Sequence, residues 1–276
     1  MTRIDLLTLF PDFVRSFADT GLIGRAQRAG TIAVEPTHLR DFAVNTQGQV
    51  DDTPYGGGSG MVLRCEPAAA AIEQVRQKSP NSRVILLSPR GRRFDQADAH
   101  RLKQHCEAGG NLAFLCPRYE GVDERIAERY VDESLSIGDF ILMGGEVAAF
   151  AIIEAVVRLL PNVLGNETSL TEESFERRLL EYPQYTKPQI FGEHRVPEVL
   201  LSGNHRAIEE WRTDRAREDT VQRRPDLLEP LAPMPGELSA ALMHYPVRNK
   251  QGEIITSSLT TIDVHDFARS AKTYGL

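Results

Sequence analysis

The sequence predicts an α/β protein whose core is a parallel sheet, and two observations support this prediction. Along residues 1–160, apolar runs of strand length alternate with longer segments of helical spacing. This alternation is typical of parallel sheets, because neighbouring parallel strands need a crossover connection, which is usually a helix. The second observation is that several strand-sized runs lead directly into turns containing glycine, proline and charged residues. We therefore expect a ligand site at the carboxyl ends of the strands.

The expected elements can be placed along the chain. Buried strands are predicted at residues 3–9, 83–87 and 111–116, each of which is a short apolar run. An extended segment at 31–39 is predicted to lie at a sheet edge, because Pro36 has no N–H to donate. Helices are predicted from Pro11 onward and at 22–29, 66–77, 95–107, 147–160 and 206–217. Residues 50–61 are too rich in glycine for helix or strand and are expected to form a loop.

A stretch that ends in two glycines, residues 136–145, leads into the apolar helix. Gly138 and the pair Gly144–Gly145 enclose an apolar run of strand length. Glycine before a helix leaves backbone N–H groups free for a ligand, but it also serves plain tight turns. Spacing alone leaves both interpretations open.

Two further turns are expected at the same edge of the sheet. Ser88–Gly91 and Pro117–Gly121 each follow a predicted buried strand. We interpret both turns, together with residues 136–145, as parts of one candidate ligand site. For the second turn, a surface ion pair between Arg118 and Glu120 is the alternative.

Composition argues against several classes of protein. No apolar run reaches the roughly 18 residues that span a bilayer, and the N-terminus reads as a strand rather than a signal peptide, so we expect a cytoplasmic protein without membrane contact. The three cysteines lack C-x-x-C spacing and the seven histidines lack H-E-x-x-H, so neither a disulfide framework nor a metal site is predicted. P-loop and dinucleotide-binding fingerprints are absent. The net charge of −7 argues against nucleic-acid binding over the whole surface, although basic side chains can gather locally.

We predict five segments. They are an α/β domain at 1–160, a polar interdomain linker at 161–175, a helical domain at 176–229, a proline-rich linker at 230–236, and a fragment at 237–276 that is too short to bury a core alone.

Arginines gather in the helical domain. Arg206, Arg212 and Arg215 lie around Trp211, which is consistent with phosphate contacts. A solvated face balanced by nearby carboxylates is an equal alternative. Arg158 lies in the last turn of the apolar helix, four residues after Glu154. This spacing allows an ion pair between the two side chains, which would give Arg158 a structural role.

Six motifs occur in colinear order along residues 1–230. They are Leu-Phe-Pro at 9–11, the segments 54–61, 87–91 and 118–125, the glycine stretch 136–145, and the segment 199–205. Together they resemble bacterial tRNA (guanine-N1)-methyltransferase, the TrmD family of the SPOUT superfamily. The resemblance implies a SPOUT-type parallel sheet with a C-terminal trefoil knot, followed by a small helical tRNA-binding domain. It also implies a homodimer with the active site at the subunit interface.

The resemblance implies an activity as well. A methyl group would pass from S-adenosyl-L-methionine to N1 of the guanosine 3′ of the anticodon, tRNA position 37. Mg²⁺ is left open as a further requirement, with no dedicated protein site. The general base for the N1 proton would be Glu173, and Arg158 would stabilise charge on O6.

Other roles follow by position in the same way. The cofactor-binding residues would be Leu87, Ser88, Pro89, Tyr119, Glu120, Gly121, Ile137, Gly138, Phe140, Leu142, Gly144 and Gly145. The residues that contact tRNA would be Asp51, Asp52, Gly58, Arg206, Arg212 and Arg215.

Two positions depart from the family pattern. The family usually has Asp where this chain has Glu173, and Glu172 beside it is a rival for the role of base. Pro117 stands where glycine is common in the family. Proline has no N–H, so the turn at 117–121 loses a donor that could have served the cofactor. The alternative function is therefore a tRNA-binding SPOUT protein with reduced or lost catalysis.

The tail, residues 237–276, is similar over a short stretch to the start of a second SPOUT-type RNA methyltransferase domain. The half of such a domain that binds the cofactor would be missing. We predict that the tail has no methyltransferase activity of its own, so that its deletion preserves turnover on tRNA.

Overall fold

The computed structural model of this chain describes residues 1–164, 173–228, 247–248 and 254–255. The chain divides into two compact units, Met1–Arg217 and Glu218–Leu276. Within the described residues, no helix is both long enough and apolar enough to cross a membrane.

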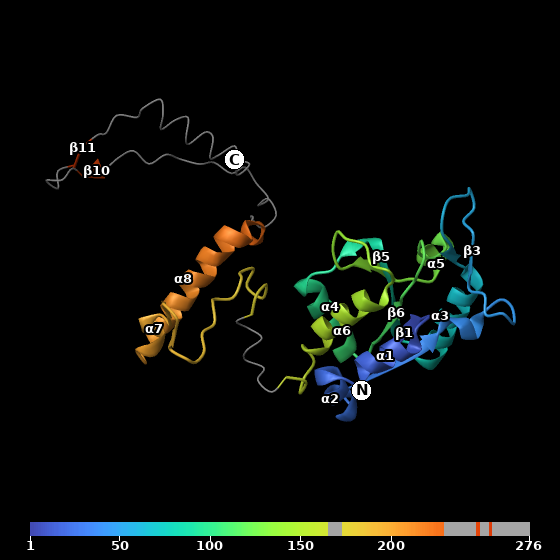
Figure 1. Cartoon of the computed structure of the whole chain (residues 1–276), viewed down its shortest axis with the longest axis horizontal. Helices are drawn as coiled ribbons and strands as arrows, with labels where there is room; N and C mark the ends of the chain where they lie inside the picture. Colours follow the sequence, from blue (N-terminus) through green and yellow to red (C-terminus); the bar gives the residue numbers. More distant parts are fainter. Residues whose placement is uncertain (165–172, 229–246, 249–253, 256–276) are drawn as a thin grey trace. The chain divides into compact units, whose positions relative to one another are not determined.

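A five-stranded sheet forms the centre of the first unit (Figure 1). Its order is β2-β1-β6-β5-β7, with bounds Ile32–His38, Thr2–Thr8, Asn111–Leu115, Ser82–Arg93 and Glu133–Ser136. Every pairing in it is parallel, which confirms the predicted sheet. β2 is an edge strand, as Pro36 predicts. The other edge strand, β7, carries no predictive pattern, because its sequence Glu-Ser-Leu-Ser has one apolar residue.

Two apolar clusters show that both faces of the sheet are covered. In β5, Ile85 and Leu87 belong to one cluster, whereas Val84 and Leu86 belong to the other, as expected for side chains that alternate between faces. The helices that supply the first cluster are α1 (Pro11–Ala18), α2 (Gly21–Arg28), α4 (Gln96–Glu107) and α6 (Glu146–Val157). The elements that supply the second are α3 (Cys65–Lys78), α5 (Glu124–Arg129) and the 3-10 turn η1 (Leu39–Phe42). At six residues, α5 is too short to show helical periodicity in the sequence.

Three predicted turns or loops differ from the structure. β5 continues past residue 87 to Arg93, and Ser88–Gly91 is a bulge, since Leu87 and Arg92 both pair with Leu135. The expected loop at 50–61 is wrong at its start, because β3 (Asp51–Asp52) pairs antiparallel with β4 (Val62–Leu63) and the glycines connect them. The apolar run after Gly138 is not a strand, because β7 ends at Ser136 and the chain is irregular until α6 begins. A bulge and a two-residue ladder leave no periodic signal in a sequence.

Within residues 173–228, the chain contains one long helix and four short elements. They are β8 (Ile190–Phe191), β9 (His194–Arg195), α7 (Glu198–Leu201), α8 (His205–Arg223) and the 3-10 turn η3 (Pro225–Leu228). β8 and β9 form an antiparallel hairpin. The helix expected at 206–217 is present and runs six residues further. In the second unit, β10 (Val247–Arg248) pairs antiparallel with β11 (Ile254–Ile255). The division into five segments stays a prediction.

Candidate functional site

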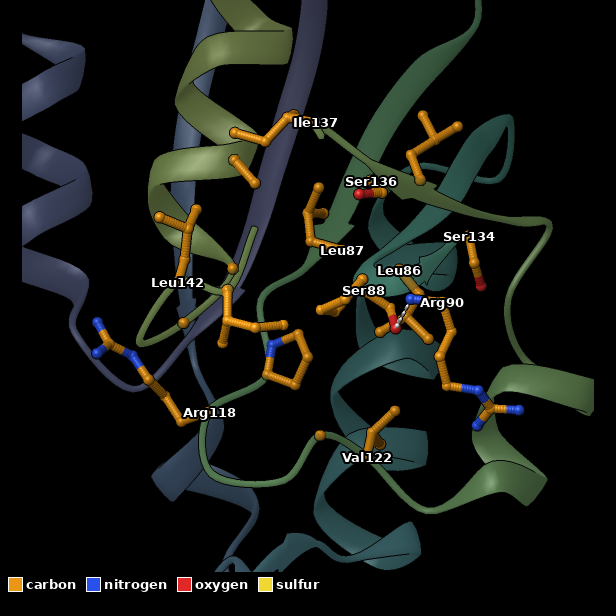
Figure 2. Close-up of a pocket in the computed structure, with 18 of the residues that line it drawn as sticks. Leu86, Leu87, Ser88, Arg90, Arg118, Val122, Ser134, Ser136, Ile137 and Leu142 are labelled. Carbon is orange, nitrogen blue, oxygen red and sulfur yellow. Dashed lines mark hydrogen bonds between the residues drawn. The ribbon is translucent and has the colours of Figure 1, made fainter. Parts of the chain in front are cut away.

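A cavity of about 410 Å³ lies at the edge of the sheet where β6 and β7 end and where β5 bulges (Figure 2). It is lined by the bulge of β5, the turn after β6 and the residues that follow β7, so the three turns predicted to meet do meet. All twelve residues that the resemblance assigns to the cofactor line this cavity: Leu87, Ser88, Pro89, Tyr119, Glu120, Gly121, Ile137, Gly138, Phe140, Leu142, Gly144 and Gly145. The carboxyl ends of parallel strands thus supply one continuous lining.

The turn after β6 and the loop at 137–145, which we call the cofactor loop, are tied together at its end. The backbone N–H of Gly145 donates to the carbonyl of Pro117 at 3.1 Å. A Cβ at Gly145 would lie 2.7 Å from Cα of Cys116, so only glycine allows this approach. Pro117 lacks an N–H, but its carbonyl still holds the loop.

Arg118 makes a different ion pair from the one that its sequence neighbours suggest. Its Nη2 lies 3.1 Å from Oε2 of Glu146 rather than on Glu120. The Glu146 side chain is only 1% exposed, and its Oε1 accepts a hydrogen bond of 2.7 Å from the Thr8 hydroxyl. A glutamate directly after two glycines and at the start of a helix is the sequence signal that points to this site.

Arg158 and Glu173 lie in direct contact. Arg158 caps the C-terminus of α6, and its Nη2 donates to Oε1 of Glu173 at 2.5 Å. This hydrogen bond raises the pKa of the Arg158 guanidinium, while burial acts in the opposite direction. The expected side-chain pair with Glu154 is not what the structure shows, since only the backbone N–H of Arg158 reaches the Glu154 carbonyl, at 3.2 Å. Glu172, the rival base, lies outside the described residues.

The segment after the linker is anchored to α4 just beyond Glu173. Glu176 accepts hydrogen bonds of 2.8 Å from Gln96 and from Nε2 of His100. Burial pushes the pKa of Glu176 up, but these hydrogen bonds outweigh it and leave the pKa below its usual value. The predicted base, Glu173, therefore lies three residues before Glu176, which is held against α4 by hydrogen bonds.

Asp51 and Asp52 lie on the β3–β4 hairpin beside the cavity but do not line it. The hairpin is joined to the turn after β6 by backbone hydrogen bonds from Glu120 N to Met61 O, at 2.9 Å, and from Leu63 N to Gly121 O, at 3.0 Å. Gly58, in the connecting loop, has a φ of +120° and open space around it. The glycine loop is thus held next to a wall of the cavity.

The three arginines predicted to contact tRNA have different surroundings on α8. Arg206 is exposed and pairs with Glu210 at 2.9 Å, which fits the solvated-face interpretation for this residue. Arg212 is partly buried, and its guanidinium lies 4.6 Å from the ring centre of Tyr182. Arg215 is exposed.

Metal-binding potential is low in the part of the chain that the structure describes. It contains no group of three or more His, Cys, Asp or Glu side chains placed to hold an ion. Cys106 and Cys116 are buried, and burial raises the pKa of the Cys106 thiol to about 11.

The fold and the cavity define an α/β protein with a ligand site at the carboxyl ends of its parallel strands. The family model of tRNA (guanine-1)-methyltransferase TrmD matches residues 2–230, and the chain belongs to this family. A second family model, for an S-adenosylmethionine-dependent RNA methyltransferase, matches residues 237–276.

Three relatives show how far the similarity extends, and each is named tRNA (guanine-N1)-methyltransferase. The protein of Nitratidesulfovibrio vulgaris is 44% identical over 99% of this chain, which spans 66% of that protein's length. The protein of Anaeromyxobacter dehalogenans is 50% identical over 82% of this chain and 90% of its own length. The protein of Deinococcus radiodurans is 48% identical over 91% of this chain and 88% of its own.

Proposed function

We propose that this protein transfers a methyl group from S-adenosylmethionine to N1 of the guanosine 3′ of the anticodon in tRNA. The observation that carries the proposal is the convergence of all twelve assigned cofactor residues on one cavity in a member of this family. The names of the relatives support guanine N1 as the methylated atom. The position in the tRNA rests on the resemblance of the motifs.

The residues of the cavity fit S-adenosylmethionine. The lining combines apolar side chains such as Leu87 and Ile137 with backbone groups of the cofactor loop, and small-molecule sites usually have this composition. The close approach at Gly145 leaves the loop no room for a side chain. When bound, S-adenosylmethionine supplies a methyl group whose bond to sulfur breaks as the bond to N1 forms.

Arg158 and Glu173 supply the remaining chemistry. Guanine N1 carries a proton, so a carboxylate must accept it, and Glu173 is the proposed acceptor. Arg158 uses one N–H of its guanidinium to hold Glu173, and its other donors are available to stabilise negative charge on O6. A direct hydrogen bond thus joins the proposed base, Glu173, to the proposed cation, Arg158.

The proposed partners are tRNA and a second copy of this chain. A surface of exposed apolar side chains supports the homodimer, and we call it the α1–α6 patch: Phe10, Phe13, Ile141, Met143 and Val147. Two of its residues, Ile141 and Met143, belong to the cofactor loop and line the cavity, which agrees with an active site at the subunit interface. The trefoil knot, the cytoplasmic location and the inactive tail complete the proposal.

Replacing Glu173 by Gln is the test of the proposed base. The amide cannot accept the N1 proton, so we expect methylation of a tRNA transcript to slow by about 100-fold or more. Binding of S-adenosylmethionine, measured by calorimetry, should stay at the wild-type level. Glu172→Gln is the matched control and should keep the wild-type rate.

Other outcomes identify what is wrong. If Glu172→Gln loses turnover and Glu173→Gln keeps it, the base is Glu172. The alternative function is a tRNA-binding protein without catalysis. It would be supported if the wild-type protein binds tRNA in a salt-dependent way but does not methylate a guanosine-containing transcript. A transcript with adenosine at the target position should not be methylated at all.

A further inference from the structure

Glu146 is a buried carboxylate for which the proposed chemistry has no use. Charged side chains are almost never fully buried unless they are paired, and Glu146 is 1% exposed. It lies between Thr8, the last residue of β1, and Arg118, in the turn after β6. As the first residue of α6, it also lies in the positive field of a helix N-terminus. Three elements, β1, the turn after β6 and α6, therefore meet at this one carboxylate.

Arg118 connects this carboxylate to the cofactor loop. Its Nη1 donates to the carbonyl of Met143 at 3.4 Å, and its guanidinium lies 4.3 Å from the ring centre of Phe10. A Cβ at Gly144 would lie 2.2 Å from Nε of Arg118, so the loop rests directly on this side chain. Figure 2 shows the Arg118 side chain extending away from Ser88 and Arg90. Arg118 itself lines the cavity and is in direct contact with the loop.

The pair retains unused hydrogen-bonding capacity. Within the described residues, Oε2 of Glu146 and Nε of Arg118 are both buried and make no hydrogen bond of good geometry, although the ion pair joins the two side chains at 3.1 Å. A small shift of the guanidinium would satisfy both atoms, and the contacts with Met143 and Gly144 would carry the loop with it.

We infer that Glu146 is a positioning residue that holds the cofactor loop, through Arg118, in the shape that binds S-adenosylmethionine. This inference rests on the proposed function. Glu146 touches neither reacting atoms nor the proposed base, and its effect is on cofactor affinity. The carboxylate fixes Arg118, Arg118 fixes Met143 and Gly144, and these residues line the cavity.

The test uses Glu146→Gln in the full chain, with Glu154→Gln as a matched control on an exposed position of the same helix. The amide keeps the shape and weakens the ion pair, so KM for S-adenosylmethionine should rise by about tenfold, whereas kcat on tRNA stays close to wild type. Glu154→Gln should change neither constant. A lower melting temperature with an unchanged KM would show that Glu146 is only a core residue and would overturn the inference.

A double-mutant cycle with Arg118→Met tests the route through Arg118. If the two residues act as one unit, the double variant should bind S-adenosylmethionine no more weakly than Arg118→Met alone, and Arg118→Lys should recover part of the affinity. Additive losses would overturn the inference. Should Glu146→Gln fail to fold, Thr8→Val removes the hydroxyl partner instead and should raise KM by a smaller factor.

The two proposals fail separately. Calorimetry measures the affinity for S-adenosylmethionine without tRNA and so tests the positioning role of Glu146. Methylation of guanosine-containing tRNA by the wild-type protein tests the proposed function. A wild-type protein that binds the cofactor but methylates no tRNA refutes the function alone. Normal turnover together with wild-type cofactor affinity in Glu146→Gln refutes the inference alone.

Discussion

Gly144 and Gly145 show how single residues shape the candidate site. Both lack a side chain where the cofactor loop meets its support, but their neighbours differ in kind. Next to Gly145 lies backbone, the Cα of Cys116, whereas next to Gly144 lies a side chain, that of Arg118. Backbone in a packed core cannot yield, and a long side chain can.

This difference predicts an order of effects. Gly145→Ala forces its Cβ against buried backbone, so we expect a loss of about 2 kcal/mol in the free energy of unfolding, together with weaker cofactor binding. Gly144→Ala should cost less stability, because the Arg118 side chain can shift, although this shift would disturb its ion pair with Glu146. Urea denaturation and calorimetry of both variants check the order, and a larger stability loss for Gly144→Ala would contradict it.

The sequence predicts which residues belong to the candidate site better than it predicts which side chains they contact. The family resemblance of the motifs supplied the twelve assigned cofactor residues, whereas the predicted strand ends indicated only which three turns would lie together. The partner of Arg118 does not follow, since Glu146 is 28 positions away and reaches it only when the sheet is assembled. The same holds for Arg158, whose predicted local pair with Glu154 gives way to a contact across the linker.

Among the elements, α4, β5 and β7 are joined by a network of charges. Asp98 of α4 pairs with Arg92 at 2.5 Å and with Arg101 at 2.9 Å. Glu133 of β7 pairs with Arg101 at 2.7 Å and with Arg83 at 2.6 Å. Burial pushes the pKa of both carboxyls up, but the arginine hydrogen bonds outweigh it and leave both pKa values below normal. The network fastens the bulged strand beside the cavity.

The lowered pKa values predict a dependence of stability on pH. A carboxylate whose pKa is lower in the folded state stabilises the fold above its unfolded pKa, near 4, and this stabilisation is lost as the pH falls through the folded pKa. We expect the urea midpoint to fall as the pH drops below about 4. Asp98→Asn should lower stability at pH 7 by about 2 kcal/mol and flatten this dependence. Asp12→Asn, at an almost fully exposed side chain, is the control that should change neither.

The elements that sequence patterns predict are the longer ones. β1, β6, α3 and α4 repeat their burial pattern over enough residues to be recognised. The short polar elements β3, β7 and α5 are stabilised by pairing and packing that only the assembled fold supplies. They are also the elements that border the site.

For the whole molecule, the α1–α6 patch is the surface that we propose a second copy of this chain covers, and its residues Ile141 and Met143 also line the cavity. Ile141 and Met143 are 79% and 90% exposed, and Val147 is 49% exposed on the first turn of α6. The ring of Phe13 reaches Phe150 of α6 at 5.0 Å, which joins the two helices into one surface. Exposed apolar side chains on neighbouring elements usually mark an interface. Because Ile141 and Met143 belong to the cofactor loop, the proposed interface would include part of the candidate site.

Val147→Asp tests this link. Aspartate in the first turn of a helix is compatible with the helix, so the variant should fold, but a charge within the interface should separate the subunits. We expect sedimentation to give about half the mass of the proposed dimer, and turnover on tRNA to fall because the proposed active site is shared between subunits. Val44→Asp makes the same change at an exposed valine near η1, whose residues pack on the other face of the sheet, and should leave mass and turnover unchanged. A Val147→Asp protein that keeps the wild-type mass would place the interface elsewhere, and a monomer with full turnover would show that each subunit holds a complete site.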